Sequence, residues 1–123
     1  EGKTALMHAC DQEMIDEDLV RLLLVQEQMD PNIQDKFGNT CLSYAAMRGY
    51  RYGTRAVQLI LQHAHDKLDI NKADFKGMTP LMHACRRGHT AVVKLLCRHK
   101  KIVRYENRQE ETEYAIDINK QDH

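Results

Sequence analysis

The chain has 123 residues and a mass of 14.3 kDa, which is the size of one domain. Its 18 Lys and Arg residues balance 18 Asp and Glu residues, so the chain as a whole is neither a basic nucleic-acid binder nor an acidic tail. Apolar residues make up 42% of the sequence, which is enough for a packed core. The longest aliphatic run, Leu22–Val25, is too short to span a bilayer, and the first residues show no signal peptide. We therefore expect no membrane insertion.

The first predicted helix follows Thr4, and the segment that this threonine opens recurs twice along the chain. Residues 4–10 read TALMHAC, residues 40–46 read TCLSYAA and residues 79–85 read TPLMHAC. Each threonine stands where a helix N-cap accepts a hydrogen bond from an unpaired backbone N–H. Pro80 suits the first position of its helix, where no donor is needed. The recurrence predicts three helices of the same kind.

A second helix is predicted after each of the first, from apolar residues that recur at helical spacing. Its three copies lie at residues 19–24, 56–61 and 92–97. Gly49 and Gly88 mark the turn between the two helices of the later units. The first unit has a longer connection at residues 11–18 instead, and the second unit carries an extra segment around residues 51–53.

The segment that joins successive helix pairs also repeats in fixed register. Asp30, Asp35, Gly38 and Thr40 are matched by Asp69, Asp74, Gly77 and Thr79. The two glycines suit a positive φ, and the side chains of Asp35 and Asp74 can bond the turn backbone. We therefore expect tight hairpin turns here, and the same segment starts again at residues 117–122.

This helix–turn–helix–hairpin unit resembles the ankyrin repeat, most closely at residues 77–96, which read GMTPLMHACRRGHTAVVKLL. The resemblance implies an all-α repeat solenoid of ankyrin-type helix–turn–helix units joined by β-hairpin-like loops. We treat residues 1–123 as a single ankyrin-repeat domain with units of about 1–34, 35–73 and 74–121 and an insertion at 98–116. Because both ends cut through a repeat, we expect a fragment of a longer protein.

Two departures from the family pattern affect these expectations. Met7, Ser43 and Met82 stand where the family usually has His, so the hydrogen bond that this His gives between units is in question. In the insertion, Ile102 and Val103 predict that the preceding helix continues for about one more turn. The rest of the insertion should protrude as a charged loop, either as a second contact surface or as a tolerated addition.

No catalytic or metal-binding motif stands out, and we expect neither an enzyme nor a cofactor. His8 and Cys10, like His83 and Cys85, lie two residues apart on a helix and therefore point in different directions. No nucleophile–base motif or phosphate-binding glycine loop is present. The cysteines form no disulfide framework, and we interpret all four as free buried thiols of a reducing, intracellular protein. They are Cys10, Cys41, Cys85 and Cys97.

The resemblance also implies a binding surface, since ankyrin arrays hold partners in a concave groove and at the hairpin tips. Carrying over the family's variable positions gives Lys3, Asp11 and Gln12 in the first unit. In the second and third units it gives Lys36, Phe37, Asn39, Met47, Arg48, Phe75, Lys76, Met78, Arg86 and Arg87. The two Phe residues are either exposed anchors or rings folded back on the neighbouring hairpin. The five cations form either a basic groove for an acidic or phosphorylated peptide or an ordinary solvated face.

The leading functional hypothesis is a non-catalytic protein-interaction module of the cytoplasm or nucleus. One alternative is a regulatory or substrate-recruiting ankyrin segment of a larger enzyme or channel. A second, implied by the resemblance, is a substrate for asparagine hydroxylation at Asn32, Asn71 or Asn119, although a purely structural role for these residues is favoured. A lower alternative is binding of a nucleotide or oligonucleotide in the basic groove.

Overall fold

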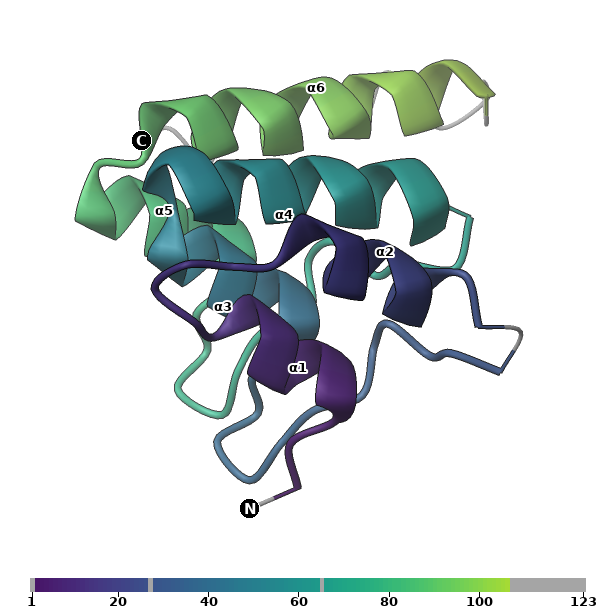
Figure 1. Cartoon of the computed structure of the whole chain (residues 1–123). Coiled ribbons are helices and arrows are strands. Elements are labelled where there is room, and N and C mark those ends of the chain that lie inside the picture. Colours follow the sequence, from purple (N-terminus) through teal and green to yellow (C-terminus); the bar gives the residue numbers. More distant parts are fainter. Residues whose placement is uncertain (1, 27, 65, 107–123) are drawn as a thin grey trace.

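A computed structural model describes residues 2–26, 28–64 and 66–106, with side chains as far as His99. Six helices follow one another in this part of the chain, and it contains no strand (Figure 1). They are α1 (Ala5–Cys10), α2 (Glu17–Leu24), α3 (Cys41–Arg48), α4 (Tyr50–Ala64), α5 (Pro80–Arg87) and α6 (Thr90–Glu106). The predicted all-α architecture is confirmed.

The helices form three pairs, α1–α2, α3–α4 and α5–α6, which stack one upon the next. The first helices of the pairs contact one another in the order α1, α3, α5, and the second helices in the order α2, α4, α6. Two rows of helices result, and Figure 1 shows the connecting hairpins projecting from the α1–α3–α5 side. None of the helices in the described ranges combines the length and the apolar character that a membrane crossing needs.

The three predicted threonine caps are present. The hydroxyls of Thr4, Thr40 and Thr79 each accept a hydrogen bond at 3.2 Å from the backbone N–H three residues on. The backbone N–H of Thr4 in turn donates to Met7 Sδ, and that of Thr40 donates to Ser43 Oγ. Two of the residues that replace the family's His therefore complete a capping box within their own helix.

The core lies between the two rows of helices. Fully buried side chains come from all six helices, and Ala45 and Ala84 let the α3 and α5 backbones approach closely. Each large aliphatic side chain buried here contributes about 1.5–3 kcal/mol relative to an exposed one. The largest of them are Met7, Leu42, Leu59, Ile60 and Leu96.

The hairpin turns are built as predicted. Gly38 and Gly77 have φ angles of 85° and 84°. Asp35 Oδ1 accepts from the backbone N–H groups two and four residues on, at 2.9 and 3.0 Å, and Asp74 Oδ1 does the same at 2.9 Å to both. These local bonds fix the shape of each tip without any contact from a neighbouring unit.

Successive hairpins are joined side by side. Asn32 Nδ2 donates to the carbonyl of Lys67 at 2.8 Å, and the backbone N–H of Asp69 donates back to Asn32 Oδ1 at 2.7 Å. Nearer the tip, the backbone N–H of Phe75 donates to the carbonyl of Phe37 at 3.2 Å. Both ends of the Asn32 amide therefore bridge the two hairpins.

The second helices vary in length. The extra segment at residues 51–53 is helical, so α4 has 15 residues where α2 has 8. Gly53 permits this, because a Cβ there would lie 2.6 Å from the carbonyl oxygen of Ala45. The predicted extension through Ile102 and Val103 is confirmed by α6, which continues to Glu106. The rest of the insertion, Asn119 and the segment 117–122 lie outside the described residues.

Candidate functional site

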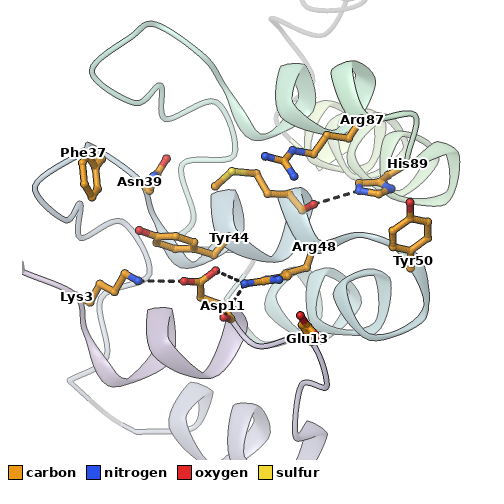
Figure 2. Close-up of a pocket in the computed structure, with 11 residues that line it drawn as sticks. Lys3, Asp11, Glu13, Phe37, Asn39, Tyr44, Arg48, Tyr50, Arg87 and His89 are labelled. Atoms are coloured by element: carbon orange, nitrogen blue, oxygen red, sulfur yellow. Dashed lines mark hydrogen bonds and ion pairs between the residues drawn. The ribbon is translucent and has the colours of Figure 1, made fainter.

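A groove of about 900 Å³ opens between the first hairpin and the ends of α1, α3 and α5 (Figure 2). Its walls come from the segment before α1, the residues just after α1, the hairpin before α3, the inner side of α3 and the two turns that follow α3 and α5. The groove includes part of the surface that the resemblance assigns to partner binding.

The floor of the groove holds two ion pairs that share one carboxylate. Asp11 Oδ2 lies 3.0 Å from Lys3 Nζ, and Asp11 Oδ1 lies 3.0 Å from Arg48 Nη2. Arg48 Nη2 also donates to the backbone carbonyl of Asp11 at 3.0 Å. Figure 2 shows Asp11 between the two cations. Asp11 therefore offsets one of the two positive charges and occupies the side of both cations that faces it.

The α5 end of the groove is aromatic. His89 Nε2 donates to the carbonyl of Met47 at 3.1 Å, and its ring meets that of Tyr50 edge-on with 4.7 Å between centroids. Gly49 makes room for His89, because a Cβ there would lie 2.2 Å from the imidazole. Tyr50 has a φ of 47°, which costs a non-glycine residue about 1–2 kcal/mol, yet its side chain is 79% exposed. The contact with His89 therefore helps to hold Tyr50 in this conformation, with its side chain exposed at this end of the groove.

The hairpin end of the groove is formed around Tyr44. The Tyr44 hydroxyl donates to Asp35 Oδ2, and Lys3 Nζ lies 5.0 Å from the centre of the tyrosine ring. Burial opposes ionisation of Asp35, but the hydrogen bonds from Tyr44 and from two backbone N–H groups outweigh it and hold the pKa of Asp35 below its usual value. Nearby, Asn39 Oδ1 is buried and has no donor among the described residues.

A second surface, which we call the tip strip, follows the two hairpins and α5. It comprises Lys36, Phe37, Phe75, Lys76, Met78 and Arg86. The Phe75 ring covers Gly38, where a Cβ would lie 2.7 Å from it, and Arg86 Nη1 lies 3.6 Å from Met78 Sδ. Phe37 and Phe75 are nevertheless 55% and 69% exposed. The Phe75 ring therefore rests on the neighbouring hairpin and still faces solvent.

The structure divides the ten predicted contact residues between these two surfaces. Five of them line the groove and six belong to the tip strip, with Phe37 shared. The groove members are Phe37, Asn39, Met47, Arg48 and Arg87. Two of the first-unit positions, Lys3 and Asp11, also line the groove. Gln12 does not; its side chain donates to the carbonyl of His8.

Sequence reasoning did not identify Glu13, Tyr44, Tyr50 and His89 as lining the groove. One signal was available, because Gly49–Tyr50 occupies the same place after the first helix as Gly88–His89. The charge balance of the groove was also missed, because Arg48 of the second unit pairs with Asp11 of the first unit. Unlike Lys3 and Arg48, the third groove cation, Arg87, is exposed and forms no hydrogen bond or ion pair with any residue in the described ranges.

None of the four cysteines is in a disulfide, but they are not all buried. Cys10 and Cys41 are buried as predicted, and burial raises the pKa of the Cys41 thiol to about 12. The prediction is wrong for Cys85, which is exposed, and Cys97 is only partly buried. The reason is positional: Ala46, the counterpart of Cys85 in α3, is covered by the next helix pair, whereas Cys85 lies on the outer side of the last described pair. Nowhere in the described part of the chain do three or more His, Cys, Asp or Glu residues gather as a metal site would require.

The chain matches known proteins over nearly its whole length. The family described as "Ankyrin repeats (3 copies)" matches residues 6–122. SMC5-SMC6 complex localization factor protein 1 of Bos taurus is 34% identical over 116 residues, and the protein of the same name from Homo sapiens is equally similar. Each of these alignments covers 94% of this chain and 10% of the relative.

A viral protein is similar as well. Putative ankyrin repeat protein L92 of Acanthamoeba polyphaga mimivirus is 35% identical over 98 residues, covering 80% of this chain and 22% of the viral protein. The chain therefore spans about a tenth of the length of the two mammalian relatives and about a fifth of the viral one.

Proposed function

The chain belongs to the ankyrin-repeat family, and from that premise we propose that it is a non-catalytic module that binds a protein or peptide partner through its groove and tip strip. Ankyrin repeats are in general protein–protein interaction modules. The observation that carries the proposal is the pair of phenylalanine side chains, which stay more than half exposed on hairpins that are themselves fixed by hydrogen bonds. Exposed aromatic side chains on a rigid frame are typical anchors of an interface.

We further propose that the partner segment is acidic or phosphorylated. The tip strip carries Lys36, Lys76 and Arg86, and Arg87 extends this charge to the rim of the groove. Within the groove itself the cations outnumber the anions only slightly, because Asp11 and Glu13 oppose Lys3, Arg48 and Arg87. The tip strip therefore supplies most of the electrostatic attraction in this proposal.

The relatives suggest the setting in which such binding is used. Two of them are named as localization factors of the SMC5-SMC6 complex. We propose that this chain likewise acts as the recruiting segment of a longer protein inside the cell, in the cytoplasm or nucleus. The absence of a disulfide among its four cysteines accords with a reducing compartment.

Selection from a random peptide library on the immobilised chain tests the proposal. We expect the selected peptides to be enriched in Asp, Glu or phosphorylated residues. Replacing both Phe37 and Phe75 by Ala should weaken their binding by roughly tenfold or more. Tyr52→Ala removes an exposed aromatic side chain of α4 that does not line the groove, and it should leave binding unchanged.

The same assay separates the alternatives. Arg86→Glu together with Arg87→Glu should abolish binding of acidic peptides while the thermal unfolding transition stays in place. Peptides that bind both charge-reversed and wild-type chains equally well would contradict an acidic partner. Tighter binding of an oligonucleotide than of any selected peptide would favour the nucleic-acid alternative instead.

A further inference from the structure

The position of Asp11 has a consequence for what the groove can bind. Each oxygen of its carboxylate is already bonded to a cation at 3.0 Å, one to Lys3 and the other to Arg48. The side chains of the three residues are 17%, 26% and 37% exposed for Lys3, Asp11 and Arg48, so solvent screens this cluster less than an ordinary surface pair. Asp11 thus stands where the anionic group of a ligand would have to stand.

The surrounding structure holds Asp11 in this position. It is the C-cap of α1, and its backbone N–H bonds the carbonyls of Met7 and His8. A carboxylate at a helix C-terminus is disfavoured by the helix dipole, and the two cations compensate for that cost. Lys3 is further fixed above the Tyr44 ring. The cluster is therefore pre-organised rather than formed by chance between mobile side chains.

An incoming carboxylate would have to displace this internal one. It would bring the same charge and the same two acceptor oxygens, but it would also lose its freedom on binding and leave Asp11 without its partners. The Asp11 carboxylate is part of the chain, so its effective concentration beside the two cations is higher than that of a ligand in solution. Arg87, in contrast, has no anion beside it in the described part of the chain.

We propose that Asp11 is a specificity-determining residue that closes the groove floor to anionic groups, so that an acidic partner contacts Arg87 and the tip strip instead. This inference rests on the proposed function for its biological meaning, because it states which cations of the groove a partner can use. Removal of the Asp11 carboxylate from the groove floor should therefore create an anion site at Arg48.

Sulfate alone is a probe that does not depend on any partner. The side-chain Nε–H resonances of Arg48 and Arg87 would be followed by NMR during sulfate titration of the wild type and of Asp11→Asn. We expect the Arg87 resonance to respond in both proteins, and the Arg48 resonance to respond to sulfate with an affinity at least about fivefold higher in Asp11→Asn than in the wild type. Asp11→Ser serves as a second variant should the first be poorly folded.

Glu13→Gln is the matched control, because it removes one negative charge from the groove without freeing Arg48. Its Arg48 resonance should behave as in the wild type. An Arg48 response to sulfate that is equal in the wild type and Asp11→Asn would overturn the inference. So would an equal gain in Glu13→Gln, since the effect would then be one of net charge.

An octa-glutamate peptide gives the second arm. In the wild type, Arg87→Gln should weaken its binding about fivefold and Arg48→Gln should change it less than twofold. Asp11→Asn should tighten binding, and adding Arg48→Gln to it should remove the gain. If no variant binds the peptide while the sulfate contrast is present, the inference about Asp11 stands and the acidic partner of the proposed function fails.

Discussion

The junction between the first and second helix pairs differs in its chemistry from the junction between the second and third. At the first, Arg48 of α3 binds Asp11 and Arg55 of α4 binds Glu17, both at 3.0 Å. At the second, His89 packs against Gly49 and bonds a backbone carbonyl. Equivalent helix pairs of one solenoid are thus linked by ion pairs at one junction and by close packing around His89 at the other. The two junctions should therefore respond to different perturbations.

The largest expected effect is at the second junction. Gly49→Ala places a methyl group 2.2 Å from the His89 ring at a backbone conformation of φ 53° and ψ −144°, which only glycine adopts easily. We expect a loss of about 3 kcal/mol of unfolding free energy from steric overlap and backbone strain together, measured by urea denaturation. Gly77→Ala is the control, because it also has a positive φ but meets nothing within 4 Å. It should cost only about 1 kcal/mol, and equal losses would show that packing against His89 is not what distinguishes this junction.

An intermediate effect is expected at the hairpins. Asn32→Ala removes two hydrogen bonds that join successive hairpins and should cost about 1.5 kcal/mol. Asn71 occupies the same place in the next hairpin, and its side chain bonds no residue in the described ranges. Asn71→Ala should therefore change the urea midpoint very little. A large effect at both positions would indicate that the asparagine acts within its own turn.

The smallest effect, and the one that depends on salt, is expected at the first junction. Arg48→Gln should cost about 0.5–1 kcal/mol at low ionic strength, because the pair with Asp11 is only partly shielded from water. The difference from the wild type should shrink in 1 M NaCl, where the screening length is about 3 Å. Arg87→Gln, which breaks no described interaction, should have no effect at either salt concentration. A loss that is unchanged by salt would mean that Arg48 stabilises the junction by packing rather than by charge.

Much of the fold follows from residues whose partners lie a few positions away. Thr40 caps its helix through the residue three positions on, and Asp35 shapes its turn through backbone groups two and four residues on. Such local bonds form in any context that allows the turn, so the pattern in the sequence predicts them. The half of the site that lies on hairpin tips could be predicted for the same reason, since Phe37 and Phe75 stand next to the turn glycines.

The groove could be predicted only in part, because its decisive contacts join residues far apart in the chain. Arg48 lies 37 residues from Asp11, and His89 lies 42 residues from Met47. Neither pair has a spacing that a local rule recognises, and both depend on how closely two helix pairs stack. The extra residues at 51–53 were visible in the sequence. The sequence did not show that the helix they lengthen would place Tyr50 at the groove.

The helices, their caps, the hairpin turns and the repeat that orders them could therefore be predicted from the residues alone, because these rest on short-range hydrogen bonds and on apolar periodicity. Which of the equivalent positions are covered, and which charges are paired, depends instead on how the helix pairs stack. Leu22 and Leu59 occupy the same place in their helices, yet Leu22 is 61% exposed and Leu59 is 1% exposed. Burial and ion pairing belong to the neighbour that a residue meets, and the stacking of helix pairs is what supplies that neighbour.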